Sequence, residues 1–222
     1  MISTQGLSYQ YAGGASLRFP DVTVAQGATL LLSGPSGCGK STWLALIAGL
    51  MRPTSGQLTV AGQALNDLAS VATDAWRAST IGFLPQKLHL SAALTVRQNL
   101  ALAQWASGIP EDQAAIDAAL SALGVAELAD RKPAQLSGGQ AQRVALARAV
   151  LHQPKVILAD EPSASLDDAA AADAITLLLV TARSRSATLV IAAHDARVAA
   201  LLSADAACAR GLQRLQLLRR QS

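Results

Sequence analysis

Aromatic residues are scarce in this sequence, where they make up 3% of 222 residues. Proteins that hold single-stranded nucleic acid without a sequence preference stack the bases on aromatic side chains. The formal net charge at pH 7 is only +3, too small an excess to indicate a surface that follows a phosphate backbone. Composition therefore does not support a nucleic-acid partner, and none is expected.

Cysteines are also few: Cys38 and Cys208 cannot form a disulfide framework and are typical of a reducing compartment. No apolar run reaches the ~18 residues that a membrane-spanning helix needs. The first residues, Met1–Gln10, lack the basic and then apolar regions of a secretory signal. These absences together predict a cytoplasmic protein.

The length allows one substantial hydrophobic core and is short for two full domains. Hydrophobic residues make up 51% of the chain and charged residues 15%, a balance typical of a folded protein. A single domain over residues 1–222 is expected.

Short apolar runs alternate with helical patterns along the chain, which indicates an α/β fold. Three runs are almost continuously apolar, as expected of strands that a parallel sheet buries on both faces: Thr29–Gly34, Lys155–Asp160 and Ala187–His194. Gly56–Gly62 instead alternates between apolar and polar residues and is bounded by glycines. This segment is predicted to be a half-exposed antiparallel strand.

The segment Leu94–Leu128 has a helical pattern and contains no convincing strand. Within it we predict that a helix starts at Pro110, with Glu111 and Asp112 in its first turn, and that Gly124 lies just past the end. The segment is therefore interpreted as a helical insertion in an α/β core.

A glycine-rich stretch, "GPSGCGKST", follows the first apolar strand and precedes a helical run. It fits the pattern G-x-x-x-x-G-K-[ST], in which glycines let backbone N–H groups turn inward around phosphate oxygens. The lysine of this pattern reaches the β- and γ-phosphates, and the hydroxyl after it ligates Mg²⁺. The residues predicted to bind a nucleoside triphosphate here are Gly34, Pro35, Ser36, Gly37, Cys38, Gly39, Lys40, Ser41 and Thr42.

Two adjacent carboxylates, Asp160 and Glu161, end the second apolar strand. The carboxyl ends of parallel strands form the edge where α/β proteins bind ligands. Asp160 is predicted to hold Mg²⁺, and Glu161 to orient the attacking water or accept its proton. A helix cap or a surface pair is the alternative interpretation.

Two more polar side chains follow strand-like runs. His194 ends the run "ATLVIAAH" and is predicted to contact the γ-phosphate, although a lone histidine is more often structural. Gln86 follows "IGFLP" and is predicted to touch Mg²⁺ or the attacking water. By itself Gln86 is a weak signal.

The stretch "LSGGQAQRVALARAV" has apolar residues at helical spacing from Ala141 to about Leu151. Ser137 is a candidate N-cap for this helix. Gly138 and Gly139 are harder to explain, because a helix start needs no glycine pair and glycine costs conformational entropy. The pair predicts that something approaches the backbone closely.

In this order, over nearly the whole chain, the motifs resemble those of the ATP-binding subunits of ABC transporters. The matching segments are the phosphate loop Gly34–Thr42, Gln86 in "FLPQ", "LSGGQ" at Leu136–Gln140, Asp160 with Glu161, "SASLD" at Ser163–Asp167, and His194.

The resemblance implies a RecA-like P-loop NTPase core with a mainly parallel sheet, an N-terminal antiparallel β subdomain and a helical subdomain. It places the ATP-binding core in residues 1–86 and 152–222. The helical subdomain, which carries "LSGGQ", would comprise residues 87–151.

The resemblance also implies that two subunits pack head to tail around two ATP molecules. Ser137, Gly138, Gly139 and Gln140 would then contact the ATP held by the other copy, so the glycine pair leaves room for that nucleotide. Asp167 resembles the aspartate of a loop that crosses the dimer interface. Tyr11 resembles the aromatic residue that stacks on adenine, with Tyr9 as the competitor and simple packing as the alternative for either tyrosine.

The implied partners are a second ATP-binding subunit, identical or not, and an integral membrane permease subunit at the inner face of the cell membrane. A groove between the helical subdomain and the Gln86 region would receive a short helix of the permease. The stretches around Gln86 and Glu161 are most similar to compact cassettes of the lipoprotein-release and macrolide-efflux type. This similarity favours export over import of amino acids or other small solutes.

A soluble ATPase of the same family, acting on ribosomes or DNA, is the alternative. Such chains typically carry two cassettes or a long coiled-coil insert, and this sequence has one cassette and no heptad run. The last residues contain Arg210, Arg214, Arg219 and Arg220 between leucines. They are predicted to form a final strand or helix and a basic tail, with an amphipathic membrane-surface element as the alternative.

Overall fold

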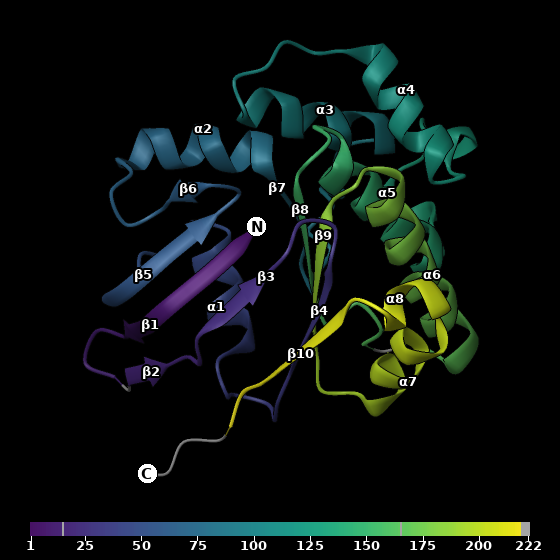
Figure 1. The fold of residues 1–222 in the computed structure, drawn as a ribbon. Helices are drawn as coiled ribbons and strands as arrows, with labels where there is room; N and C mark the ends of the chain where they lie inside the picture. Colours follow the sequence, from purple (N-terminus) through teal and green to yellow (C-terminus); the bar gives the residue numbers. More distant parts are fainter. Residues whose placement is uncertain (15, 165, 219–222) are drawn as a thin grey trace.

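The computed structural model describes residues 1–14, 16–164 and 166–218, and in these ranges two sheets and a set of covering helices make an α/β fold (Figure 1). Ser165 of the "SASLD" stretch and the arginines at 219 and 220 of the predicted basic tail lie outside the described residues.

The central sheet is entirely parallel, which confirms the predicted strand arrangement. Its strand order is β10 (Leu212–Gln216), β4 (Thr29–Ser33), β9 (Thr188–Ala193), β8 (Val156–Asp160) and β7 (Ile81–Leu84). All residues of β8 and β9 are buried, as their continuous apolar sequences require.

Alternate residues of the central strands belong to two different hydrophobic cores. Leu31, Ile157 and Ile191 face one core, which the helices α3 (Val96–Ala106), α4 (Gln113–Ala122), α5 (Gly138–Val150), α6 (Asp168–Ser184) and α7 (Ala196–Ala204) supply. Leu32 and Leu158 face the other core, against α1 (Lys40–Ile47) and the second sheet. Because both faces are covered, both sets of alternate positions are mainly apolar.

The second sheet is antiparallel and is built around the N-terminal strand. It contains β1 (Ile2–Gln10), β2 (Ser16–Arg18), β3 (Val22–Val24), β5 (Ser55–Val60) and β6 (Gln63–Ala64). The predicted antiparallel strand in Gly56–Gly62 is β5, and its exposure alternates along its second half. The helix α1 packs between this sheet and the parallel one, which is why its Trp43 and Leu44 are fully buried.

The segment between β7 and β8 is helical, as predicted, and contains α3, α4, α5 and the short 3-10 turns Ala126–Leu128 and Pro133–Gln135. In Figure 1 it forms a layer at one end of the molecule, next to α2 (Ser70–Thr80). This placement follows from the extensive contacts of α3 and α4 with α5.

The predicted start of α4 at Pro110 is wrong. The helix starts at Gln113, and the carboxylate of Asp112 caps it by accepting a hydrogen bond from the Ala115 N–H at 3.0 Å. An aspartate cap satisfies a free N–H that a proline start leaves open, so the cap sets the boundary. Gly124 does lie just past the end, in the left-handed region with φ 65°.

The helix α5 begins at Gly138, directly after the candidate N-cap, and so extends three residues before Ala141, where the apolar periodicity begins. Ser137 is the N-cap, as predicted, and forms a capping box with Gln140: each side chain accepts a hydrogen bond from the other residue's backbone N–H. The reciprocal cap stabilises a first turn that two glycines would otherwise disfavour.

The C-terminal region continues from α7 through the single turn α8 (Ala206–Ala209) into β10, which pairs with β4. The predicted final element is thus a strand and not an amphipathic surface helix. Among the described residues, the structure contains no helix with the length and apolar character needed to cross a bilayer.

Candidate functional site

Three parallel strands end side by side and bring the predicted polar residues to one edge of the sheet. Strand β4 lies next to β9, and β9 lies next to β8. A cavity of about 490 Å³ lies at this edge. The described residues that line it are Tyr11, Leu17, Ser36, Gly37, Gly39, Lys40, Ser41, Thr42, Gln86, Glu161 and His194.

The glycines of the loop before α1 are needed for its shape. Gly37 and Gly39 have φ angles of 78° and 103°, which L side chains rarely adopt. At Gly34 an added Cβ would lie 2.5 Å from the Leu217 carbonyl oxygen and 2.7 Å from the Cys38 Sγ. The loop therefore makes a tight turn that only glycine fits at these positions.

Helix α1 opens directly onto the cavity. Within the described chain, its N-cap residue Gly39 provides no side-chain hydrogen bond to the free N–H groups of the first turn. Such a helix end carries partial positive charge and is a ready site for an anion. The predicted phosphate-binding loop thus has the geometry that its sequence pattern requires.

Lys40 is the best-placed cation of the cavity and is only 7% exposed. Its Nζ lies 2.9 Å from the Gly34 carbonyl oxygen and 3.4 Å from that of Pro35. The same Nζ lies 3.4 Å from Glu161 Oε1. The ammonium group is therefore held at the centre of the loop by groups on two different strand ends.

Glu161 is fixed from several sides. Its backbone adopts φ 50°, and its N–H donates to the Ala192 carbonyl oxygen at 2.8 Å. Its Oε1 lies 2.9 Å from His194 Nδ1, and the His194 N–H donates to Oε2 at 3.4 Å. The structure therefore brings together Lys40, Glu161 and His194, which the sequence singled out separately.

Asp160 is 7% exposed, and in the described part of the chain its Oδ1 is buried without a hydrogen-bond partner. Burial, the largest influence, raises the pKa of this carboxyl group, and the neighbouring Glu161 charge adds to the rise. A hydrogen bond with Ser41 and the charge of Lys40 act in the opposite direction. A buried carboxylate oxygen without a partner needs a hydrogen-bond donor or a cation.

Tyr11 lies at the mouth of the cavity and Tyr9 does not line it, as far as the structure describes the chain. The Tyr11 hydroxyl lies 2.7 Å from Thr42 Oγ1, and the two tyrosine rings meet edge to face at 4.8 Å. Tyr11 is 40% exposed, so one part of its ring is open to a ligand. The sequence favoured Tyr11 over Tyr9, and the geometry agrees with that preference.

The signature residues Ser137–Gln140 lie elsewhere, and the described residues that line the large cavity do not include them. The Ser137 hydroxyl is engaged in the capping box. An added Cβ at Gly138 or Gly139 would meet nothing within 4 Å in the described chain, and neither residue has a positive φ. A single chain thus gives no steric or conformational reason for these two glycines.

Asp167 also lies outside the set of described residues that line the cavity. Its carboxylate caps α6 by accepting a hydrogen bond from the Ala170 N–H at 2.8 Å. This cap is a sufficient local reason for an aspartate at this position. One contributor to the cavity wall was missed: Leu17, an isolated apolar residue of a short strand whose sequence carries no functional signal.

Comparisons with known proteins agree with this geometry. Residues 17–164 match the family described as "ABC transporter". The chain is similar to the lipoprotein-releasing system ATP-binding protein LolD of Legionella pneumophila (strain Lens), with 35% identity over 205 residues that cover 90% of each protein. The LolD protein of Geobacter metallireducens is 36% identical over 208 residues, covering 91% of this chain and 92% of that protein.

Among solved structures, the chain resembles the dimeric structure of MJ0796, a bacterial ABC transporter cassette. The TM-score is 0.81 at 29% identity, and the match covers 100% of this chain and 97% of the other. It is equally similar, with a TM-score of 0.81 and 28% identity, to a dimeric post-hydrolysis state of the same cassette bound to ADP and Pi; this match covers 100% of this chain and 98% of that one.

Proposed function

The chain belongs to the ABC transporter family as an ATP-binding subunit with ATPase activity, and from this premise we propose that it drives export through a separate membrane subunit. The proposal that ATP hydrolysis by this chain powers transport rests on one observation. Glu161 contacts both Lys40 and His194 in the wall of the 490 Å³ cavity. The proposed direction of transport, export, is supported by the similarity to the lipoprotein-releasing system proteins.

The loop Gly34–Thr42 is proposed to bind the phosphates of ATP. Its N–H groups and the open end of α1 supply partial positive charge, and Lys40 supplies a full one. Tyr11, held by Thr42 at the cavity mouth, is proposed to stack on the adenine. The loop positions 35–38 belong to the same turn before α1 and are proposed to contact the phosphates with it.

The residues present fit a Mg²⁺ ion. Asp160 offers a buried carboxylate oxygen without a partner among the described residues, and the Ser41 hydroxyl interacts with the same carboxylate. Gln86, which also lines the cavity, offers an amide oxygen. Hard oxygen ligands of this kind suit Mg²⁺, which neutralises charge on the phosphate oxygens when bound.

Glu161 is proposed to orient the attacking water and accept its proton. Its carboxylate is held near Lys40 and His194, so its position does not depend on its own rotamer preference. His194 is proposed to contact the γ-phosphate, and Gln86 to touch the water or the metal. Each of these groups lies at the cavity wall, within reach of one bound ATP.

The complete site is proposed to form only between two copies, or between this chain and a second ATP-binding subunit. Ser137, Gly138, Gly139 and Gln140 would contact the ATP bound by the other copy, and Asp167 would lie at the interface. The open space around both glycines supports this assignment, and so does the dimeric form of the MJ0796 cassette.

The membrane subunit is proposed to dock in a second depression, of about 280 Å³, between α1, α2, β7, α3 and α5. Leu50, Ile81 and Phe83 give it an apolar wall, and α3, which borders the depression, also carries the exposed Trp105. This depression lies between the proposed ATP-binding core, residues 1–86 and 152–222, and the proposed helical subdomain, residues 87–151. Docking there would place the chain at the inner face of the membrane.

Replacing Asp160 with asparagine is expected to raise the melting temperature of the nucleotide-free protein and to abolish the extra stabilisation that Mg²⁺ adds to ATP. The pKa of Asp160 is raised in the folded state. At acid pH the carboxyl group is neutral in both the folded and the unfolded protein, so it does not lower the free energy of unfolding there. The free energy of unfolding then decreases as the pH rises from the usual pKa of an aspartate through the raised pKa, so the ionised carboxylate destabilises the nucleotide-free fold above that range. Thermal denaturation at pH 7 without ligand, with ATP, and with ATP and Mg²⁺ measures both effects.

The matched control is Asp195→Asn, which should change stability in the opposite direction. A hydrogen bond from the Arg197 backbone N–H lowers the pKa of Asp195, so its carboxylate stabilises the fold at neutral pH and loses this effect on acidification. A lower melting temperature of nucleotide-free Asp160→Asn, or an intact Mg²⁺ effect, would contradict the metal assignment.

Co-purification from membranes tests the transporter proposal. The tagged Glu161→Gln variant, loaded with ATP, is mixed with native membranes solubilised in mild detergent, and co-purified proteins are identified. A polytopic membrane protein is expected, and its domains outside the membrane would indicate the direction of transport. Recovery of ribosomes or DNA-repair proteins, with no membrane protein, would instead support a soluble ATPase of the same family.

A pair of surface variants makes this test specific to the proposed groove. Leu50→Glu should abolish co-purification while ATP binding stays intact, because it places a charge in the apolar wall. Val180→Glu on α6 is the control: Val180 is 53% exposed, as Leu50 is at 52%, but it does not line the groove. Equal co-purification by both variants would refute docking at this surface.

A further inference from the structure

Helix α5 holds two catalytic-site loops through side chains that the family motifs do not explain. Gln142 Nε2 donates to the Pro162 carbonyl oxygen at 2.6 Å. The Arg148 guanidinium donates to the Leu88 carbonyl oxygen at 2.6 Å and to that of His89 at 2.8 Å. Pro162 directly follows Glu161, and Leu88 lies two residues after Gln86.

The Gln142 bond acts on the loop that carries Glu161. Pro162 is buried and has no N–H, so its carbonyl oxygen is the backbone group through which this peptide can be held. Gln142 also lines a cavity of about 110 Å³ together with Gln86, Glu161 and Gly138. The amide of Gln142 therefore lies at the point where the two loops and the start of α5 meet.

The Arg148 bonds act on the loop that carries Gln86. Burial lowers the pKa of the Arg148 guanidinium, and in the described ranges no carboxylate forms an ion pair with it. Its charge is satisfied by the two carbonyl oxygens, and charge-assisted hydrogen bonds of this kind are stronger than neutral ones. If the loop moved away, the half-buried guanidinium would lose both of its carbonyl partners, so these hydrogen bonds favour movement of loop and helix together.

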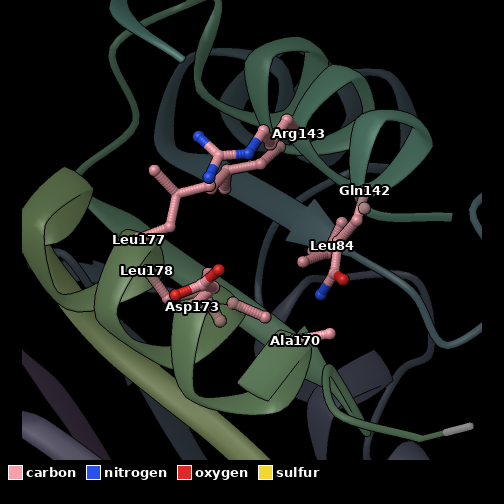
Figure 2. Close-up of a pocket in the computed structure, with 10 residues that line it drawn as sticks. Leu84, Gln142, Arg143, Ala170, Asp173, Leu177 and Leu178 are labelled. Carbon is pink, nitrogen blue, oxygen red and sulfur yellow. The ribbon is translucent and has the colours of Figure 1, made fainter. Parts of the chain in front are cut away.

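Space around α5 permits such a movement. A cavity of about 80 Å³ separates α5 from α6 and β7, and its wall includes Gln142, Arg143, Asp173 and Leu177 (Figure 2). Figure 2 shows side chains of α5 and α6 facing each other across this space. Close-packed helices resist displacement, whereas an unfilled seam lets one helix shift without steric clash.

The start of α5 carries the glycine pair proposed to meet the nucleotide of the second copy. A continuous hydrogen-bonded helix of 13 residues connects that end to Gln142 and Arg148. A displacement at Gly138 is therefore passed to both loops by one rigid element.

We propose that Gln142 and Arg148 are positioning residues for ATP hydrolysis, through which α5 sets the places of Glu161 and Gln86 when its glycine end meets the second nucleotide. This inference rests on the proposed roles of Glu161, Gln86 and Gly138. A purely structural role for the two side chains would change thermal stability and leave the kinetics of the folded protein unchanged.

Steady-state hydrolysis by the full chain tests this inference. Gln142→Met keeps the length of the side chain and removes the donor, and kcat is expected to fall about tenfold or more, since misplacement of catalytic groups by ~1 Å costs up to about a hundredfold. The KM for ATP should stay within about twofold, because neither bond touches the phosphate loop. Arg148→Met should behave similarly, and Arg148→Lys should recover part of kcat because it keeps one charged donor.

Arg143→Met is the matched control. Arg143 lies on the same helix and also donates to a carbonyl oxygen, that of Leu123 at 3.3 Å, but this acceptor belongs to the helical segment and to neither catalytic loop. Its kcat should match that of the native protein.

The Glu161→Gln variant is measured in the same assay to separate two kinds of failure. Native kcat in Gln142→Met and Arg148→Met, with Glu161→Gln inactive, would overturn the positioning role and leave the proposed function standing. A lowered melting temperature with unchanged kcat would overturn it in the same way. Normal turnover by Glu161→Gln would remove the catalytic role on which the inference depends, and the inference would fail with it.

Discussion

The Glu161→Gln variant is expected to bind ATP and to hydrolyse it at least about a hundredfold more slowly than the native protein, since a positioned general base contributes about 10²–10⁴-fold. The amide keeps the shape of the side chain but cannot accept a proton. Lys40 loses one charged neighbour and keeps the carbonyl oxygens of Gly34 and Pro35, so the phosphate loop remains intact. Phosphate release and ATP binding, measured on the same preparation, give the two quantities.

The variant should also accumulate as an ATP-bound dimer, because the step that reopens the dimer is blocked. Size-exclusion chromatography with and without ATP detects this species. Glu127→Gln is a suitable control, since Glu127 is exposed in the helical segment and is not among the described residues that line the cavity. Normal turnover in Glu161→Gln would disprove the role assigned to this carboxylate.

The second large effect is expected from Gly139→Ala, which should abolish ATP-dependent dimerisation and hydrolysis without harming the fold. In the described chain an added Cβ has open space there, and the backbone is already helical. Alanine favours a helix over glycine by at most about 1 kcal/mol, so the isolated subunit should be as stable as the native one or slightly more stable. Activity and stability should thus move in opposite directions.

Gly211→Ala provides the matched control, because Gly211 also has open space around its Cβ position in the described chain and no positive φ, and it lies outside the signature. That variant should dimerise and hydrolyse ATP normally. If Gly139→Ala dimerised like the native protein, the glycine pair would not be a contact for a second copy. If the Gly139→Ala variant unfolded, the glycine would be required for the fold of its own subunit and not for contact with a second copy.

Local sequence was sufficient for the elements whose pattern and burial agree. Continuous apolar runs predicted β4, β8 and β9 because both faces of a parallel sheet are covered, and alternation predicted β5 because one of its faces is partly open. The tight turn before α1 was predictable because its glycine pattern lies in consecutive residues. The start of α4 was not predictable, because Asp112 competes with other possible caps and periodicity does not distinguish between them, whereas the Ser137 cap of α5 was proposed from the sequence.

The order and chemistry of the motifs, and the family they indicate, were determined by the sequence alone. Only the tertiary structure decided which of these groups touch. Glu161 meets Lys40 and His194 across 121 and 33 residues of chain because three parallel strands end at one edge. The hydrogen bonds that Gln142 and Arg148 donate could not be predicted from the sequence. Their acceptors are backbone carbonyl oxygens, which every residue has, so no residue type indicates where those hydrogen bonds end.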